Sequence, residues 1–240
     1  MLKDSLFERE YSQPGSFKFD AEVSAVFDDM VQRSVPLYTA IQDLLTALTL
    51  QYFQTGTAIY DLGCSTGESI LKLLNEPALK DANFVALDYS PEMLDKAKQR
   101  LSHLSAAIAF KQGDLETGCD VKNASVVLLN LVLQFTDPKT RPATLKAIYD
   151  GLNRGGALLL VEKVCFESES IQEQYTTLYY DYKKARGYSQ NEIKQKELSL
   201  EGVLRPHTID YNKTLLLNAG FSTVETFFQC YNFVGFLALK

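Results

Sequence analysis

Residues 59–68 read Ile59-Tyr60-Asp61-Leu62-Gly63-Cys64-Ser65-Thr66-Gly67-Glu68. This pattern predicts a buried strand, then a loop with glycine at 63 and 67 and a small residue at 65, then a helix. Such a loop lets a ligand approach the backbone closely and presents the N–H groups of a helix N-terminus. It differs from the dinucleotide fingerprint G-x-G-x-x-G, because the third glycine is missing and the Asp61 carboxylate precedes the first. A carboxylate here favours a ligand with an amino group or a sulfonium cation over a pyrophosphate, although an ordinary strand-to-helix turn also fits.

Short apolar runs alternate with helical periodicity around this stretch. Strands are predicted at Ala58–Leu62, Phe84–Leu87, Ala107–Phe110, Ser125–Leu131 and Ala157–Glu162, with helices at 67–75, 91–104 and 138–151. Near-continuous apolar strands separated by helices indicate a parallel sheet covered on both faces. The adjacent β-rich runs Phe221–Cys230 and Tyr231–Leu239 predict an antiparallel hairpin. The expected fold class is therefore α/β, a class I methyltransferase (Rossmann-like) fold with a seven-stranded, mostly parallel sheet, a C-terminal antiparallel hairpin and added helices.

Further helices are predicted at both sides of this core. Asp20 can cap a first helix, and Pro36 precedes a second, so residues 1–55 are expected to form an N-terminal helical arm or lid. Residues 168–218 lack strand character and predict two or three helices. We expect one domain over residues 1–240.

Polar side chains follow three other predicted strands. Asp88 ends the second strand, where an acidic residue can accept hydrogen bonds from ribose hydroxyls. Asp114 follows the third strand and is placed to accept from an adenine amino group, with Leu115 packed on the ring. Asn130 lies at the carboxyl end of the fourth strand, where open α/β sheets bind ligands. Each also fits a solvated or capped strand end, but together they indicate a nucleoside site.

Composition excludes several classes of function. The chain has 24 Lys+Arg and 30 Asp+Glu, a net charge of −6, so we expect no direct nucleic-acid binding through bulk charge. No apolar run is long enough to cross a membrane, and the N-terminus has no apolar signal core, so a cytoplasmic protein is expected. A metal site is not expected, because there are only 2 histidines and the 4 cysteines are widely separated, at Cys64, Cys119, Cys165 and Cys230.

Several longer motifs are more distinctive than the glycine loop. They are Phe19-Asp20, Gln32-Arg33-Ser34-Val35-Pro36-x-Tyr38, Tyr60-Asp61-Leu62-Gly63-Cys64-Ser65, Leu133-Gln134-Phe135, Gly151-Leu152-Asn153-x-Gly155-Gly156-Ala157-Leu158, Gly187-Tyr188-Ser189 and Phe228-Gln229-Cys230-Tyr231-Asn232-Phe233. With them the chain resembles, nearly end to end, the carboxy-S-adenosylmethionine synthase family within the S-adenosylmethionine-dependent class I methyltransferases.

The resemblance implies a homodimer that uses prephenate to carboxylate the methyl carbon of S-adenosylmethionine. The product is the donor for a later wobble-uridine modification of tRNA. The helices of 168–218 would cover the pocket. The cofactor would be S-adenosylmethionine, with S-adenosylhomocysteine or carboxy-S-adenosylmethionine as related ligands. With Asp61 and Gly67 from the loop, the expected cofactor site comprises Tyr38, Gly63, Cys64, Ser65, Asp88, Tyr89, Asp114, Leu115 and Asn130. Tyr89 is expected to stack near the adenine edge.

One departure from the family concerns its carboxylate-binding arginine. After Gly187-Tyr188-Ser189 the family continues to Gln-Lys-Arg, and that arginine holds the added carboxylate. Here Glu197 stands at the arginine position, and its charge would repel a carboxylate. Lys196, one residue earlier, lacks the planar fork of arginine. Arg205 is a further candidate replacement.

Methyl transfer from a sulfonium requires neither a metal nor a covalent enzyme intermediate; the protein must align an acceptor and exclude water. Because of Glu197, the first hypothesis is a small-molecule methyltransferase on a synthase-like scaffold, with Tyr38, Arg33 and Tyr180 as catalytic candidates and a small-molecule substrate. The second is a carboxy-S-adenosylmethionine synthase in which Lys196 or Arg205 replaces the arginine. A nucleoside-binding protein without turnover and, more remotely, a nicotinamide oxidoreductase are the alternatives.

Overall fold

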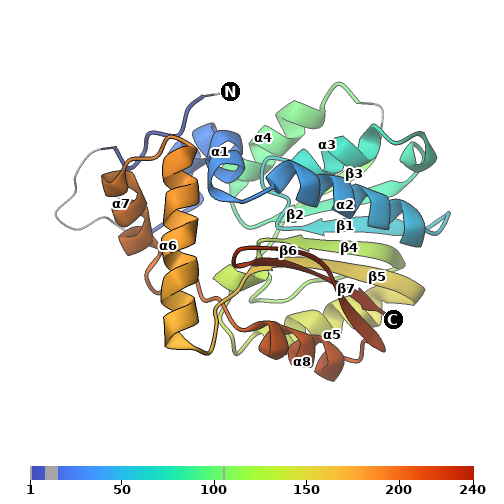
Figure 1. Cartoon of the computed structure of the whole chain (residues 1–240). Coiled ribbons are helices and arrows are strands. Elements are labelled where there is room, and N and C mark those ends of the chain that lie inside the picture. Colours follow the sequence, from blue (N-terminus) through green and yellow to red (C-terminus); the bar gives the residue numbers. More distant parts are fainter. Residues whose placement is uncertain (1, 9–15, 105) are drawn as a thin grey trace.

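A computed structural model describes residues 2–8, 16–104 and 106–240. Its centre is a seven-stranded sheet in the order β3-β2-β1-β4-β5-β7-β6 (Figure 1). The strands are β1 (Ala58–Leu62), β2 (Asn83–Asp88), β3 (Ala107–Gln112), β4 (Ala124–Asn130), β5 (Leu152–Lys163), β6 (Thr223–Cys230) and β7 (Phe233–Leu239). Strands β1 to β5 are parallel, and β7 pairs antiparallel with both β5 and β6. The predicted class I methyltransferase architecture is confirmed.

The strand β5 begins earlier than its hydrophobic run predicts. Its first residue, Leu152, already pairs with Ala124, and the register then shifts so that Val126 pairs with Ala157. Glycine is required inside this shift, because a Cβ at Gly156 would lie 2.8 Å from the carbonyl oxygen of Ser125.

Helices cover both faces of the sheet. The first face carries α2 (Tyr38–Tyr52), α3 (Glu68–Leu74) and α4 (Pro91–Leu101), and the second carries α5 (Arg141–Gly151) and α8 (Ile209–Ala219). Short turns of 3₁₀-helix lie at η1 (Pro77–Leu79) and η2 (Leu133–Phe135). The inner strands β1, β2, β4, β5 and β7 are largely buried, which explains their continuous apolar sequences, whereas the edge strands β3 and β6 are exposed or half-buried.

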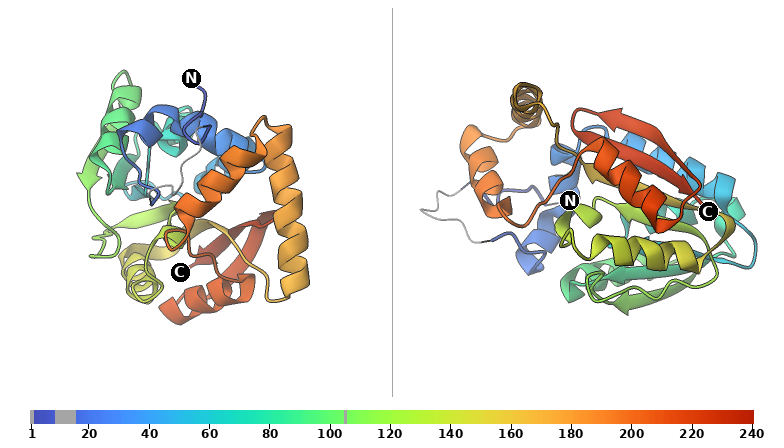
Figure 2. Two further views of the ribbon diagram at one scale, coloured as in Figure 1. Left: turned by 90° about the vertical axis from the view of Figure 1, so that its left-hand side faces the viewer. Right: turned by 90° about the horizontal axis from the view of Figure 1, so that it is seen from below.

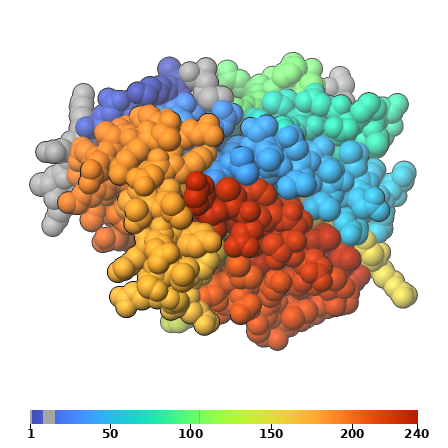
Figure 3. Space-filling model, in the orientation of Figure 1, coloured from blue at the N-terminus to red at the C-terminus, as the bar shows by residue number. Residues whose placement is uncertain are grey.

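The remaining helices lie together at one end of the sheet. They are α1 (Ala21–Ser34), α6 (Glu169–Ala185) and α7 (Gln190–Leu200), and the left panel of Figure 2 shows α7 crossing in front of the sheet with α6 beside it. Figure 3 shows the surface of α6 continuous with the N-terminal segment and with the C-terminal hairpin. The predicted cap of α1 is present, since Asp20 accepts from Val23 N at 3.1 Å. Ser90 caps α4 in the same way and accepts from Met93 N at 3.2 Å. Within the described ranges, no helix has the length and apolar character needed to cross a membrane.

Candidate functional site

A cavity of about 590 Å³ lies between the carboxyl ends of the parallel strands and the three helices α1, α6 and α7. This volume is in the range of small-molecule and cofactor sites. The cavity brings together most of the predicted cofactor residues, namely Tyr38, Asp61, Gly63, Cys64, Ser65, Asp88, Tyr89, Asp114, Leu115 and Asn130. Side chains from separate strands converge there because parallel strands end at the same edge of a sheet.

Asp88 organises the glycine loop as well as facing the cavity. One carboxylate oxygen accepts from Ser65 N at 2.8 Å and the other from Ser90 N at 2.9 Å. Burial raises the pKa of Asp88, and these two N–H groups oppose that rise. Each oxygen retains a second lone pair, so the carboxylate can still accept from a ligand hydroxyl.

Asp61 is a buried carboxylate with an unsatisfied hydrogen-bond acceptor. It is 2% exposed, and its Oδ2 has no hydrogen-bond partner in the described structure. Burial, with a smaller contribution from Asp88, raises the pKa of Asp61 to about 7. The buried Oδ1 of Asn130 also lacks a partner among the described residues. These two acceptors fit a ligand that brings a cation or N–H donors into the cavity.

The glycine loop is shaped by close packing. Gly63 N donates to Leu87 O at 2.7 Å, and Cys64 N donates to the same oxygen at 2.9 Å. Gly63 has φ +82°, and a Cβ there would lie 2.4 Å from Cγ2 of Val132. Gly67, predicted to bind the cofactor, does not line the cavity; a Cβ there would approach Ala97 Cβ at 3.2 Å, so this glycine permits α3 and α4 to pack closely.

A polar network ties the loop to α1. Thr66 Oγ1 donates to Asp28 Oδ1 at 2.6 Å. Arg100 pairs with the same Asp28 and donates to Glu68 Oε2 at 3.0 Å. Because Arg100 and Asp28 are each less than a quarter exposed, the network holds α1 over the cavity.

Two of the three predicted catalytic residues line the cavity. The Tyr38 hydroxyl accepts from Gln42 Nε2 at 2.8 Å, and burial raises the pKa of Tyr38, so its proton remains available for donation. Tyr180 donates to the carboxylate of Glu197, and both residues line the cavity. Desolvation and this hydrogen bond raise the pKa of Tyr180. The structure therefore retains these phenols as neutral hydrogen-bonding groups.

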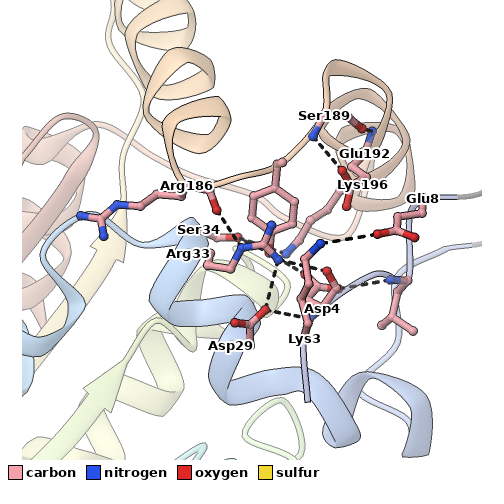
Figure 4. A network of polar contacts seen from close by, with 12 residues as sticks. Lys3, Asp4, Glu8, Asp29, Arg33, Ser34, Arg186, Ser189, Glu192 and Lys196 are labelled. Atoms are coloured by element: carbon pink, nitrogen blue, oxygen red, sulfur yellow. Dashed lines mark hydrogen bonds and ion pairs between the residues drawn. The ribbon is translucent and has the colours of Figure 1, made fainter. Parts of the chain in front are cut away.

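Arg33, the third predicted catalytic residue, does not line the cavity. Its guanidinium donates to Arg186 O at 2.9 Å, Asp4 O at 3.0 Å and Asp29 Oδ2 at 3.1 Å (Figure 4). It also lies 3.8 Å above the centre of the Tyr188 ring. These contacts use Nε and Nη1, while the buried Nη2 has no hydrogen-bond partner among the described residues. Arg33 thus joins Asp4 and α1 to the end of α6, outside the cavity, and its catalytic role stays a prediction.

Aromatic side chains close the cavity beside Asp88 and Asp114. Tyr89 is 51% exposed, and its ring packs edge-on against Phe19 with centroids 6.0 Å apart. Phe19 also packs edge-on against Phe135 at 5.1 Å. Sequence reasoning did not assign Phe19 and Phe135 to the site, although both lie in motifs that marked the family resemblance.

Three lysines line the cavity beyond Asn130, and sequence reasoning identified only one of them. Lys163 ends β5, Lys183 lies on α6 and Lys196 on α7. Burial lowers the pKa of Lys183 to about 7 and that of Lys196 to about 8. The position of Lys163 at a strand end was a usable signal, whereas a single helix sequence does not reveal where Lys183 points. Arg205, the other candidate replacement, does not line the cavity.

Comparisons with known proteins agree with this geometry. A methyltransferase domain family matches residues 59–156. Proteins named carboxy-S-adenosyl-L-methionine synthase are 39% identical in Shewanella piezotolerans and 40% in Enterobacter sp., over 99% of this chain and 98% and 97% of theirs. Among solved structures, the S-adenosylmethionine-dependent methyltransferase SibL matches with TM-score 0.63 at 14% identity, over 97% of this chain and 63% of its own. Human N-acetylserotonin methyltransferase, solved in complex with S-adenosylmethionine, matches with TM-score 0.53 at 19% identity, over 92% of this chain and 58% of its own.

Proposed function

We propose that this chain, which belongs to the carboxy-S-adenosyl-L-methionine synthase family, binds S-adenosylmethionine and transfers a carboxyl group from prephenate to its methyl carbon. The observation that carries the proposal is the likeness over 99% of the chain to proteins of that name, combined with a cavity that holds the acidic strand ends. Small-molecule methylation, ranked first from Glu197 alone, becomes the second candidate.

The residues present fit the cofactor. The unpartnered buried oxygen of Asp61 suits the amino group of its methionine part. The free lone pairs of Asp88 suit the ribose hydroxyls, and Asp114 with Leu115 suits the adenine. When bound, the cofactor would supply a sulfonium group that acidifies its methyl C–H bonds, so that the methyl carbon can lose a proton as its bond to the carboxyl carbon forms. Prephenate would lose that carboxyl group together with hydroxide and leave as phenylpyruvate, and the hydroxide and the methyl proton would form water. In methyl transfer the same positive charge would make the methyl carbon electrophilic.

The protein's own contribution is enclosure and orientation. Helices α1, α6 and α7 cover the strand ends, which limits the access of water to the reacting groups. Tyr38 offers a neutral hydroxyl donor at the cavity wall. Carboxyl transfer also requires groups that hold an anionic donor opposite the methyl carbon, and the cavity continues from Asn130 to Lys163 for that purpose.

A specific observation supports the second candidate, methyl transfer to a small acceptor. Glu197 lines the cavity where the family has an arginine, and it accepts a hydrogen bond from Tyr180. A carboxylate at that wall repels a carboxylated product and favours a neutral or cationic acceptor. The homodimer expected from the family resemblance also belongs to this proposal, and light scattering on purified protein tests it.

Mass spectrometry of the cofactor tests the proposed function. Purified protein incubated with S-adenosylmethionine and prephenate should yield cofactor with one additional carboxyl group. Asp88→Asn should abolish the product, whereas the control Asp81→Asn, at an exposed position just before β2, should not. Unmodified cofactor with unconsumed prephenate would refute carboxyl transfer, and S-adenosylhomocysteine formed with an added acceptor would establish the second candidate.

A further inference from the structure

We propose that Lys163, Lys183 and Lys196 form a binding site for a substrate that carries two carboxylates, in the half of the cavity away from the adenosine. The inference deepens the proposed function and rests on it for the identity of the neighbouring ligand. It assigns anion binding in this chain to three lysines from three separate elements, in place of the arginine that Glu197 replaces.

The charge of the strand ends changes sign across the sheet. In spatial order the residues that line the cavity are Asp88 on β2, Asp61 on β1, Asn130 on β4 and Lys163 on β5. Asn130 pairs with Val161, so Lys163 lies two residues beyond it along the neighbouring strand. The acidic half suits the cationic and hydroxyl groups of the cofactor, and the basic half suits an anion beside it.

The helices that cover the cavity add two more cations at the same end. Lys183 is 5% exposed and Lys196 is 7% exposed. The ammonium groups of Lys163 and Lys183 lie 4.9 and 5.4 Å from the centre of the Tyr179 ring. Those of Lys183 and Lys196 lie 5.6 and 6.0 Å from the centre of the Tyr188 ring. Two shared rings therefore gather the three cations.

These cations have too little compensating negative charge in the protein. Within the described ranges none of the three forms an ion pair, and the one hydrogen bond of their ammonium groups runs from Lys196 Nζ to Ser34 Oγ at 3.4 Å. The nearby carboxylates are Asp4 and Glu197. Asp4 already accepts from Tyr188 at 2.6 Å, and Glu197 accepts from Tyr180.

Burying charge without a partner is strongly unfavourable, so the arrangement calls for an anionic ligand. A dicarboxylate would bring two negative charges to the three ammonium groups. The positive charge of Arg33 on α1 lies nearby and disfavours the charged form of Lys196 further. The free protein thus holds a basic half-cavity in an unfavourable state that the anion relieves.

Proton uptake on binding follows from this environment. Burial, followed by repulsion from Lys196 and Lys163, holds the pKa of Lys183 near 7, while Glu197 and Asp4 partly oppose that effect. Above that pH much of Lys183 is neutral in the free protein, and a bound carboxylate favours its charged form. Anion affinity should therefore fall as the pH rises above 7, and binding at pH 8 should take up a proton.

Calorimetric titration of malonate into protein saturated with S-adenosylhomocysteine tests the site. Lys183→Gln and Lys196→Gln should each weaken malonate binding at least ~10-fold, and acetate should bind the wild type more weakly than malonate. The exposed lysines Lys184 and Lys194 on the same helices provide matched controls, and their change to Gln should leave malonate affinity unaltered. All variants should bind S-adenosylhomocysteine within about two-fold of the wild type.

Buffers of different ionisation enthalpy measure the proton uptake in the wild type. Uptake should be present at pH 8, smaller at pH 6, and reduced at pH 8 in Lys183→Gln. Lys183→Met should also raise the Tm of the free protein, because it removes an unpaired buried charge, whereas a structural role would lower it.

Equal malonate affinity in the Lys183, Lys184, Lys194 and Lys196 variants would overturn the inference. The inference would also be overturned if the wild type bound neither malonate nor prephenate. Lysine-dependent malonate binding without carboxylated cofactor would sustain this site and refute the proposed function. If Lys183→Gln and Lys196→Gln formed carboxylated cofactor as well as the wild type, the proposed function would stand and this lysine site would be refuted.

Discussion

Replacing Asp61 with asparagine should stabilise the free protein while weakening its ligand binding. The Asp61 carboxyl has a pKa of about 7 in the folded chain, against a usual value of 3.8. Because each tenfold difference in proton affinity corresponds to about 1.4 kcal/mol, the folded state loses roughly 4 kcal/mol between these pH values. An asparagine side chain carries no charge and would avoid this loss.

The direction in which stability changes with pH follows from the number of protons that the folded and unfolded chains bind. Between about pH 4 and pH 7 the folded chain holds a proton on Asp61 that the unfolded chain has released, so the free energy of unfolding falls as the pH rises. The Asp61→Asn variant should match the wild type near pH 4 and exceed its stability by up to about 4 kcal/mol at pH 8. Urea unfolding followed by circular dichroism at both pH values measures the difference.

Binding of S-adenosylhomocysteine should move in the opposite direction. A hydrogen bond between a charged amino group and this carboxylate contributes about 1.5–3 kcal/mol, so the variant should bind roughly 10- to 150-fold more weakly at pH 8. Glu162, whose pKa burial also raises, to about 8, is common to both proteins and cancels in the comparison. Equal pH dependence of stability in the two proteins, together with unchanged affinity, would refute the reasoning.

Two further predictions concern the loop and its support. Gly56 and Gly63 share a positive φ near +80°, but a Cβ at Gly56 meets nothing within 4 Å. Gly56→Ala should therefore lower the free energy of unfolding by about 1 kcal/mol, and Gly63→Ala should lower it by about 1–3 kcal/mol more. Gly63→Ala should also abolish S-adenosylhomocysteine binding. Equal urea midpoints for the two variants would contradict this prediction. Arg100→Met should lower the free energy of unfolding by about 1–3 kcal/mol and weaken S-adenosylhomocysteine binding several-fold, because it leaves Asp28 without its cation. Calorimetric titration measures the affinity, and an unchanged value would contradict this prediction.

The sequence predicted the sheet and the acidic half of the cavity because both depend on local patterns. An apolar run specifies a buried strand, and the polar residue that ends it must lie at the carboxyl edge of a parallel sheet. Asp61, Asp88, Asp114 and Asn130 could therefore be assigned to one place before their distances were known. The structure brings all four to the same cavity.

Long-range packing decided the rest. Arg33 and Lys196 both looked available to a substrate, but helix rotation and the contacts of the arm direct one into a polar network and the other into the cavity. Lys183 has an identical neighbour at 184, and only the packing of α6 distinguishes a residue 5% exposed from one on the surface. The sequence alone thus determined which residues end the strands, while the tertiary structure determined which helix residues meet them, because a side chain's environment on a covering helix depends on contacts far away in the chain.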